Sequence, residues 1–510
     1  MILKFIKKKD RFLLAVAFIS GLAIMAMEIS ASRLLAPYFG TSIFVWTNII
    51  GVVLVALSLG YYFGGKLADL IPRIDLLLKL IFVAGCLFLI IPIIIKPLSS
   101  AINLETLGFE SSSVIIFVSS LILATVLFSL PLFLLGMSSP FIIKLYLFEK
   151  NDRVGELAGR ITAVSTIGSI LGTFLPALYF IPVLGTRATI YIFALILIVL
   201  GSLGFKKNKF NSLFLLVLFV VIYFFSRVQI SNHPNTIYED ESAYQYISVR
   251  QDSAGTKYLL VNEGAGIQSI YNSQKVLTGF YYDYFNVLPY FINSVKPKEI
   301  LIIGLCGGTI ANQLSYFFPK EVEIDGVEID PKIINVAKKY FAVNAAITKI
   351  YNSDGRMFLQ NSSKKYDLII IDAYAQELYI PWTLTTKEFW ALVKDDLKSD
   401  GIMAINVNSV TPDSRLLKSI SNTMASIFSN TYITPVNNSG INYILIAASR
   451  PLDFSSLAGL TTNKQLKDLA LAYEEQTKKA AHDKNYMILT DDRAPVEFMT
   501  DRMALDYLRK

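Results

Sequence analysis

The chain has 510 residues, 53% of them hydrophobic, so it is long enough for more than one domain. Its mean hydropathy of +0.49 is too high for an ordinary soluble protein, and the excess lies before residue 227. The net charge of +7 comes largely from lysines beside hydrophobic stretches, and no basic-aromatic cluster indicates a nucleic-acid partner. Two cysteines and two histidines exclude a disulfide framework and a cysteine zinc site, and argue against a histidine metal site or a Ser-His triad.

Hydrophobic stretches long enough to cross a bilayer fill the first part of the chain and predict a transmembrane bundle of about seven helices. They fall near residues 12–36, 43–65, 76–97, 113–137, 157–183, 187–205 and 211–226. The fourth stretch continues past Gly136 to about Phe148, which is too long for one straight crossing, so we expect a break there. Small residues at helical spacing, among them Gly168 and Gly172, predict close helix packing in the fifth stretch.

Residues 299–372 alternate short apolar runs with helical segments of about 10–15 residues, which indicates βαβ units and a parallel sheet. A glycine-rich loop, Gly304–Gly308, follows the first run and lets a ligand approach the backbone at a helix N-terminus. The next three runs lead into acidic residues, which are Glu328 and Asp330, Asp354 beside Gly355, and Asp372. Such ends of parallel strands meet at the carboxyl edge of the sheet, where open α/β sheets bind ligands.

The glycine loop lacks the Lys-Ser/Thr ending of a P-loop and the full G-x-G-x-x-G of dinucleotide folds, so it favours an adenosyl-type ligand over NAD. An acid about 20 residues after the loop, here Glu328, suits hydrogen bonds to a ribose diol. The simpler alternative is that the acids are helix caps in a domain that binds no nucleotide. The regular spacing of four such features favours nucleotide binding.

Residues 235–275 alternate like short strands and predict a small antiparallel β-domain, and residues 278–294 predict an aromatic-rich helix. We therefore expect three domains: a transmembrane helical domain over 1–230, the β-domain over 235–275, and a Rossmann-like domain over 276–510.

Over about residues 240–410 the chain resembles the spermidine synthase family, specifically its membrane-fused branch. The shared features are Tyr244-Gln245, a turn leading to Gln268, the glycine loop and the strand-end acids. The segments 372–374, 380–386 and 489–497 resemble the membrane-fused branch more than the soluble enzymes. The resemblance implies a methyltransferase/spermidine-synthase α/β fold for the C-terminal domain.

The family transfers an aminopropyl group from decarboxylated S-adenosylmethionine to an amine and releases methylthioadenosine, without a metal. By resemblance, Asp372 would take the acceptor's proton, with Tyr281 as the second catalytic residue. Glu328 would hold the ribose hydroxyls and Asp354 would contact the adenine. The resemblance implies a cofactor-binding set of Gln245, Gln268, Gly304, Gly307, Glu328, Asp330, Asp354 and Gly355, and a substrate-binding set of Asp283, Tyr374, Glu377 and Asp491.

Two departures from the family bear on the donor. Gly307 stands where the soluble enzymes have an Asp that anchors the donor's amine, and Ala375 stands where their second D-x-x-D acid lies. Losing two anionic contacts for ammonium groups, each worth about 1.5–3 kcal/mol, disfavours polyamine chemistry. S-adenosylmethionine carries a carboxylate, so the loss of an acid favours it as donor. Glu377 and Asp491 would replace the lost acids if the tail folds back.

The leading hypothesis is an integral-membrane transferase that breaks the sulfonium and transfers the arm to a small-molecule amine, or cyclises it onto the donor's own amine. The alternatives are a methyltransferase on the same sheet and a transporter with a nucleotide-sensing domain. Glu28, deep in the first stretch, and the interrupted fourth stretch keep the transporter in consideration. The bilayer is the expected partner, and the sequence leaves a homodimer open.

Four clusters of Lys and Arg beside the hydrophobic stretches fall on one side of the membrane, which the positive-inside rule makes cytoplasmic. With seven spans the C-terminal domain would then lie outside, whereas adenosyl cofactors are made in the cytoplasm. We expect a multi-pass protein of the cell membrane, with the side of its catalytic domain left open between these two arguments.

Overall fold

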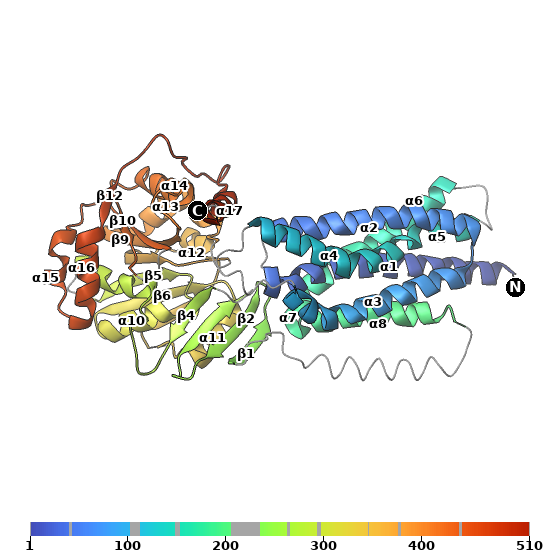
Figure 1. Ribbon diagram of the computed structural model, residues 1–510, viewed down its shortest axis with the longest axis horizontal. Helices are drawn as coiled ribbons and strands as arrows, with labels where there is room; N and C mark the ends of the chain where they lie inside the picture. The colour runs from blue at the N-terminus through green and yellow to red at the C-terminus, as the bar shows by residue number, and fades with distance from the viewer. Residues whose placement is uncertain are drawn as a thin grey trace. The chain divides into compact units, whose positions relative to one another are not determined.

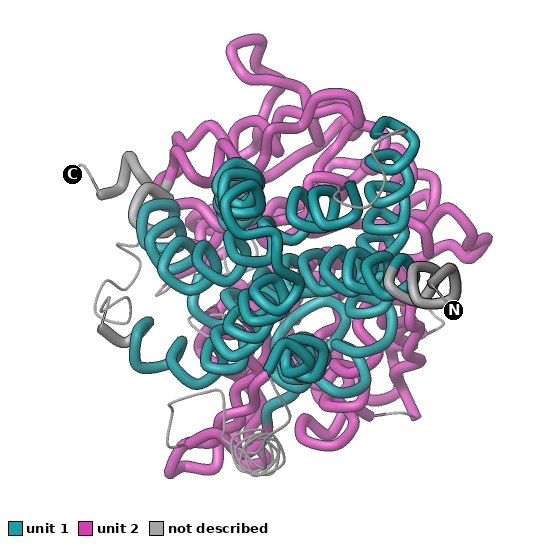
Figure 2. The backbone as a smooth tube through the Cα atoms, turned by 90° about the vertical axis from the view of Figure 1, so that its right-hand side faces the viewer, with its two compact units in different colours: residues 1–234, 239–246 teal, residues 235–238, 247–510 magenta. Residues whose placement is uncertain are grey.

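The computed structural model describes residues 2–39, 43–101, 113–147, 154–205, 235–262, 266–292, 297–344, 346–375, 379–437 and 441–508. The chain forms two compact units, coloured separately in Figure 2. Unit 1 comprises residues 1–234 and 239–246, and unit 2 comprises residues 235–238 and 247–510.

Unit 1 is helical, and most of its helices run side by side (Figures 1 and 2). Its elements are α1 (Ile2–Phe39), α2 (Ile43–Leu70), α3 (Ile74–Ala101), α4 (Ser113–Gly136), α5 (Ser138–Leu147), α6 (Val154–Leu175), the π-helix η3 (Pro176–Phe180), α7 (Ile181–Leu184) and α8 (Thr186–Ser202). Within the described residues, five segments are long and apolar enough to cross a membrane, namely Asp10–Phe39, Val45–Leu70, Ile74–Ser99, Phe117–Leu147 and Val154–Leu184.

The predicted total of about seven spans is not confirmed. The first five predicted stretches coincide with the five long segments. The sixth, near 187–205, is the shorter helix α8, whose 17 residues rise about 25 Å against a hydrocarbon core of roughly 30 Å. The seventh, 211–226, lies outside the described residues.

The expected break in the fourth span is confirmed. Helix α4 ends at Gly136 and α5 begins at Ser138, with a turn at Met137 between them. Two glycines of α2 pack against this turn. A Cβ on Gly60 would lie 2.4 Å from the Phe133 carbonyl oxygen, and one on Gly64 would lie 2.6 Å from the Met137 Cα. The break is therefore held by backbone contact that larger residues on α2 would prevent.

The glycines of α6 differ in their surroundings. A Cβ on Gly168 would lie 2.1 Å from the Phe18 carbonyl oxygen, and one on Gly172 would lie 2.1 Å from that of Leu22, both on α1. Gly159, earlier on α6, has nothing within 4 Å of such an atom. Close packing by small residues thus occurs where α6 lies against α1, as the spacing predicts for that part of the helix.

The segment 239–246 is joined to the helices by polar contacts. Buried Glu241 accepts a hydrogen bond from the backbone N–H of Thr186, at the start of α8. The Arg33 guanidinium of α1 donates to the carbonyl of Ala243. These contacts place this short segment with unit 1.

A small sheet has the strand order β1-β2-β3-β4, formed by β1 (Thr236–Glu241), β2 (Tyr246–Gln251), β3 (Lys257–Val261) and β4 (Ile267–Tyr271). Strand β3 pairs antiparallel with both β2 and β4, so the expected small antiparallel sheet is confirmed.

The large sheet of unit 2 has the order β12-β10-β11-β9-β8-β5-β6-β7. Its strands are β5 (Lys298–Ile303), β6 (Val322–Glu328), β7 (Thr348–Asn352), β8 (Tyr366–Ile371), β9 (Leu397–Asn408), β10 (Asn430–Pro435), β11 (Asn442–Ala448) and β12 (Lys478–Ala480). Strands β5 to β9 are parallel neighbours, and β10, β11 and β12 add an antiparallel edge.

Helices cover the sheet (Figure 1). Unit 2 contains α10 (Thr309–Phe317), α11 (Pro331–Tyr340), α12 (Gly355–Asn361), α13 (Lys387–Asp396), α14 (Arg415–Ala425), α15 (Leu457–Leu460), α16 (Lys467–Gln476) and α17 (Val496–Leu508). Its 3-10 helices are η4 (Tyr281–Phe291), η5 (Trp382–Leu384), η6 (Phe454–Ser456) and η7 (Lys464–Leu466). The predicted aromatic helix over 278–294 is thus a 3-10 helix, in which Pro289 supplies no N–H donor.

The sheet core explains the continuous apolar runs. On β5, Ile300 and Ile302 join one hydrophobic cluster while Leu301 and Ile303 join the other, and all four side chains are buried. Because a strand alternates its side chains between two faces, both faces of the central strands are covered, as is usual for parallel sheets. Such strands hold the loops at their carboxyl ends on a rigid base.

Replacing Gly168 by Ala should destabilise unit 1, because the new Cβ would collide with the α1 backbone, at a cost of about 1–3 kcal/mol. The matched variant Gly159→Ala has open space and should be neutral or slightly stabilising, because Ala is the better helix former. Thermal unfolding of the detergent-solubilised full chain compares the two. Equal midpoints would contradict the packing described for α6 against α1.

Candidate active site

Four strand ends meet at the carboxyl edge of the large sheet, and the predicted residues after them come together. The backbone N–H of Asp372 donates to the carbonyl of Ile303 at 2.9 Å, which ties the end of β8 to that of β5. The N–H of Gly304 donates to the carbonyl of Val327 at 3.0 Å, which ties the glycine loop to β6. The edge is therefore one connected site, as the alternation of strands and helices predicts.

Gly304 makes a close backbone contact at this edge. Its φ of +87° lies in the left-handed region, and a Cβ there would lie 2.4 Å from the carbonyl oxygen of Asp372. Only a residue without a side chain satisfies both conditions without strain. Gly355 plays a similar part at β7, since its Cβ would lie 2.3 Å from the Cγ2 of Ile303.

Glu328 lies at the end of β6 with both carboxylate oxygens accepting backbone hydrogen bonds. The N–H of Cys306 donates to Oε2 at 2.9 Å and the N–H of Asp330 donates to Oε1 at 3.0 Å. Burial raises the pKa of Glu328 to about 7. The two hydrogen bonds lower the pKa, but burial has the larger effect. Each oxygen retains a second lone pair, so the carboxylate can still accept bonds from a pair of hydroxyl groups.

Gly307 is closed off by Ser269 of β4. The N–H of Gly307 donates to the Ser269 hydroxyl at 2.8 Å, and a Cβ on Gly307 would lie 2.6 Å from the Ser269 Cβ. Gln268 is half-buried and lies at a bulge of β4, where the pairing with β3 passes from Ser269 directly to Ile267. Ser269, which sequence reasoning missed, is thus the β4 residue that contacts the loop.

Asp372 follows β8 and is held by two side-chain donors. The Tyr281 hydroxyl of η4 donates to Oδ2 at 3.0 Å, and the Asn406 amide of β9 donates to Oδ1 at 3.4 Å. Burial raises the pKa of Asp372 to about 7, and the two hydrogen bonds oppose that rise. A carboxylate with a pKa near neutrality suits proton transfer, because it is ionised yet basic at neutral pH.

Tyr374 lies beside this pair. Its hydroxyl donates to the Asn406 carbonyl at 2.9 Å and accepts from the N–H of Asn408 at 3.1 Å. Burial raises the pKa of Tyr374 well above its ordinary value, so the phenol stays protonated. Asn442 of β11 donates to the side chains of both Asn406 and Asn408.

The carboxylates of three other predicted acids accept hydrogen bonds from backbone N–H groups. Asp283 is buried and accepts four hydrogen bonds, from the N–H and hydroxyl of Thr278, the N–H of Gly279 and the Gln313 amide. Asp330 is fully buried and caps α11. Asp354 is exposed and caps α12 through the N–H of Met357. Helix capping, the simpler alternative considered for strand-end acids, therefore applies to Asp330 and Asp354.

The C-terminal tail folds back onto the sheet edge beside Gly355. Asp491 accepts hydrogen bonds from both terminal nitrogens of the Arg356 guanidinium and, at 2.7 Å, from the Thr386 hydroxyl. The pairing with Arg356 lowers the pKa of Asp491. Its charge is thus balanced by a cation of the protein itself.

Two predicted residues lie elsewhere. Gln245 is half-buried and belongs to unit 1, whereas the other described site residues belong to unit 2. Glu377 lies outside the described residues. Of the described residues, no group of three or more His, Cys, Asp or Glu side chains could hold a metal ion.

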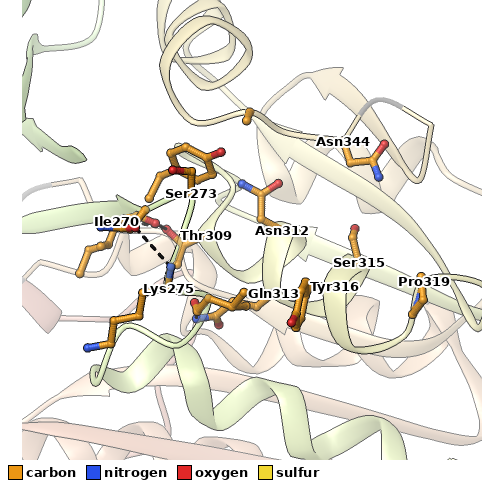
Figure 3. Close-up of a pocket in the computed structure, with 14 residues that line it drawn as sticks. Ile270, Ser273, Lys275, Thr309, Asn312, Gln313, Ser315, Tyr316, Pro319 and Asn344 are labelled. Atoms are coloured by element: carbon orange, nitrogen blue, oxygen red, sulfur yellow. Dashed lines mark hydrogen bonds between the residues drawn. The ribbon is translucent and has the colours of Figure 1, made fainter. Parts of the chain in front are cut away.

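A pocket of about 440 Å³ lies between the end of β4 and α10 (Figure 3). Its walls include Ser273 and Lys275 after β4, and Asn312 and Tyr316 of α10. None of the predicted site residues lines it. The pocket therefore does not include the two perturbed carboxylates Glu328 and Asp372, although Gln313 in its wall donates a hydrogen bond to Asp283.

Sequence reasoning missed the asparagines beneath Asp372. A signal was present, because Asn406 and Asn442 are polar residues in runs that otherwise read as buried strands. Buried carboxamides are costly unless hydrogen-bonded, so such positions are candidates for function. Their meeting, however, depends on the pairing of β9 with β11, which local pattern does not give.

Comparisons with known proteins place the site in context. Residues 281–450, all in unit 2, match the family model of the spermine/spermidine synthase domain. A "Probable polyamine aminopropyl transferase" of Bifidobacterium longum is 35% identical over 286 residues, which cover 52% of this chain and 62% of that protein. This match thus spans less than two thirds of that relative's length.

A "Polyamine aminopropyltransferase 2" of Aquifex aeolicus is 21% identical over 463 residues, covering 86% of this chain and 88% of that protein. A match of that length includes part of the helical unit. The crystal structure of a probable spermidine synthase from Corynebacterium glutamicum aligns with a TM-score of 0.40 and 19% identity, over 49% of this chain and 92% of that one.

Replacing Gly304 by Ala should destabilise unit 2 more than replacing Gly279 by Ala. Both positions have positive φ, at +87° and +82°, so both variants carry a backbone penalty of about 1–2 kcal/mol. Only Gly304 adds a collision, with the Asp372 carbonyl, since Gly279 has nothing within 4 Å. Denaturant unfolding of the full chain, followed by near-UV circular dichroism, measures the difference. Equal losses would refute the close contact between the glycine loop and β8.

Proposed function

We propose that the chain, whose residues 281–450 match the spermine/spermidine synthase domain, is an aminopropyltransferase-like enzyme that acts on an S-adenosylmethionine-type donor. The observation that carries the proposal is the ionisable pair at one sheet edge, Glu328 and Asp372. Each has a pKa raised to about 7 by burial, and each is held by hydrogen bonds from neighbouring elements. Paired perturbed carboxylates of this kind are typical of functional sites.

The donor's nucleoside lies along the ends of β5, β6 and β7. Glu328 accepts hydrogen bonds from the two ribose hydroxyls with the lone pairs that its backbone bonds leave free. The donor approaches the glycine loop at Gly304, whereas the N–H of Gly307 is already bonded to Ser269. Asp354 and Gly355 lie at the end of β7, where the adenine binds, and Gln268 completes the expected set from β4.

The acceptor lies over Asp372. Its amine nitrogen attacks the methylene carbon beside the sulfonium, a carbon–nitrogen bond forms, and the carbon–sulfur bond breaks to release methylthioadenosine. The proton from the nitrogen passes to the Asp372 carboxylate. Tyr281 and Asn406 hold that carboxylate in place, so the protein supplies positioning and a base.

The donor is either decarboxylated S-adenosylmethionine, as in the family, or S-adenosylmethionine itself. Gly307 and Ala375 remove two acids that would hold ammonium groups, and the contact of Gly307 with Ser269 leaves no room for an acid there. This supports the form that carries its own carboxylate. The acceptor is then a small amine, or the donor's own amine closing a ring.

The enzyme is tied to a bilayer by the five long apolar segments of unit 1, as a multi-pass membrane protein. The proposed domains are the helical domain over 1–230, the β-domain over 235–275 and the Rossmann-like domain over 276–510. Asp283 and Tyr374 support the substrate side of the site by holding η4 and β9, and Glu377 and Asp491 remain proposed contacts to it.

Product analysis tests the proposal. Detergent-purified protein is incubated separately with each donor, first alone and then with polyamines, and the nucleoside product is identified by mass. Methylthioadenosine is expected as the product. The donor that yields it shows whether Gly307 favours S-adenosylmethionine or its decarboxylated form. Asp372→Asn should lower turnover by about 100-fold or more while methylthioadenosine still binds. Asp400→Asn, at an exposed position, is the matched control.

S-adenosylhomocysteine as the product would mean methyl transfer and would contradict the proposal. Full turnover by Asp372→Asn would remove Asp372 as the base.

The rate should depend on pH through Asp372. The carboxylate must be ionised to accept a proton, so activity is present above its pKa of about 7 and is lost as the pH falls through that value. The Tyr281 hydrogen bond lowers this pKa, so Tyr281→Phe should move the acid limb of kcat/KM up by about one pH unit. Tyr316→Phe, at an exposed tyrosine of α10, should leave the limb in place.

Both variants are assayed with the same acceptor. The effect of the acceptor's own protonation on kcat/KM is therefore the same for both and cancels in the comparison. An acid limb that moves to lower pH in Tyr281→Phe would contradict the assigned hydrogen bond.

A further inference from the structure

Three asparagines lie in the core beneath Asp372. Asn406 and Asn408 are on β9 and Asn442 is on β11, and they are 1%, 7% and 9% exposed. The antiparallel register sets Asn442 opposite Asn408, and Asn406 lies two residues further along β9 on the same face. Their neighbours in both strands are almost all apolar, so the cluster is a polar inclusion in an otherwise hydrophobic sheet.

The asparagine cluster is connected to the Asp372 carboxylate by hydrogen bonds. The Asn442 amide nitrogen donates to Oδ1 of Asn406 at 3.0 Å and to Oδ1 of Asn408 at 2.6 Å. The Asn406 amide nitrogen in turn donates to Oδ1 of Asp372 at 3.4 Å. The chain of donors thus runs from β11 through β9 to the end of β8.

These contacts fix which end of the Asn406 amide faces Asp372. If the amide were flipped, its nitrogen would face the Asn442 nitrogen and its oxygen would face the carboxylate, so two donors and two acceptors would oppose each other. A turn of Asn442 would also set its oxygen against Oδ1 of Asn408, so it would relieve this only if Asn408 turned as well. The donor end of Asn406 is therefore held towards Asp372.

We propose that Asn442 is a positioning residue of the site, which orients Asn406 so that its amide donates to the Asp372 carboxylate. This role rests on the proposed function, because it assigns the effect of Asn442 to proton uptake by Asp372. Asn442 does not touch the reacting atoms. It acts through Asn406, and its loss frees that amide to turn its oxygen towards the base.

The other titratable groups that face Asp372 stay neutral near pH 7. They are the phenols of Tyr281 and Tyr282 on η4, the thiol of Cys306 in the glycine loop and the phenol of Tyr374 after β8. Burial raises the pKa of each well above its ordinary value. Glu328 has a pKa of about 7 as well, but its donors are the backbone N–H groups of Cys306 and Asp330, which a change at Asn442 leaves in place. A difference in the acid limb between variant and wild type then reports Asp372.

The test is the pH profile of kcat for Asn442→Leu, which removes the donors and keeps a similar volume. With the Asp372 pKa raised by about one unit, kcat should fall about tenfold at pH 6 and stay within about twofold of wild type at pH 9. The KM for the donor should change less than about twofold, because the nucleoside site lies at other strands. Asn430→Leu is the matched control, since Asn430 is a buried asparagine of β10 in the same sheet.

An equal loss of kcat at both pH values, or an effect on KM alone, would overturn the positioning role and leave Asn442 a structural residue. If Asn442→Leu does not fold, Asn442→Ser replaces it. Its single hydroxyl donor cannot serve both asparagines, so a smaller shift in the same direction is expected, and no shift overturns the role. A wild-type protein that releases no methylthioadenosine would refute the proposed function and this role with it, whereas an active wild type with an unshifted variant refutes the role alone.

Discussion

The close approach of the glycine loop to the end of β8 is the constraint on which the site depends. Gly304 has a backbone conformation that side chains disfavour, and the space where its Cβ would lie is filled by the Asp372 carbonyl. This contact brings the glycine loop and the proposed base onto one rigid edge. Gly355 makes the corresponding approach from β7 to the end of β5. The glycines therefore set the distances between the glycine loop, Asp372 and the ends of β5 and β7.

Burial of the two carboxylates has opposing effects that the surrounding hydrogen bonds balance. Loss of hydration makes an ionised carboxylate costly, and it raises the pKa of Glu328 and of Asp372 to about 7. Backbone donors to Glu328, and side-chain donors to Asp372, recover part of that cost. Because the Asp372 donors are side chains from η4 and β9, its basicity is sensitive to the packing of those elements. The Glu328 donors are backbone groups, which side-chain substitutions leave in place.

The helical unit uses glycine for a different purpose. On α6 and α2, glycines let helix backbones approach where a methyl group would collide, and these contacts occur at the α1 face of α6 and at the α4–α5 break. Between apolar helices in a bilayer the hydrophobic effect gives little drive to associate, so close backbone packing supplies the contact energy. The same residue type thus allows close contacts between strand ends in one unit and between helices in the other.

Much of this protein follows from local pattern. The apolar stretches, the break after Gly136, the strand–helix alternation and the strand-end acids are read from composition and periodicity within short windows. Capping by Asp330 and Asp354 also follows from their position before a helix. The number of spans did not follow, because helix α8 is shorter than its apolar stretch and hydropathy does not fix where a helix ends.

Tertiary structure decided which side chains meet. Ser269 against Gly307, Arg356 with Asp491 across 135 residues, and Asn442 with Asn406 across 36 residues all depend on strand register or on the path of the tail. The C-terminal tail folds back and places Asp491 beside Arg356, a pairing that the positions of acids in the sequence do not indicate. Short-range periodicity determines which residues face inward, whereas contacts between distant segments are set by the packing of whole elements. The sequence by itself thus determined the edge of the sheet and its acids, and the fold decided how those acids are held.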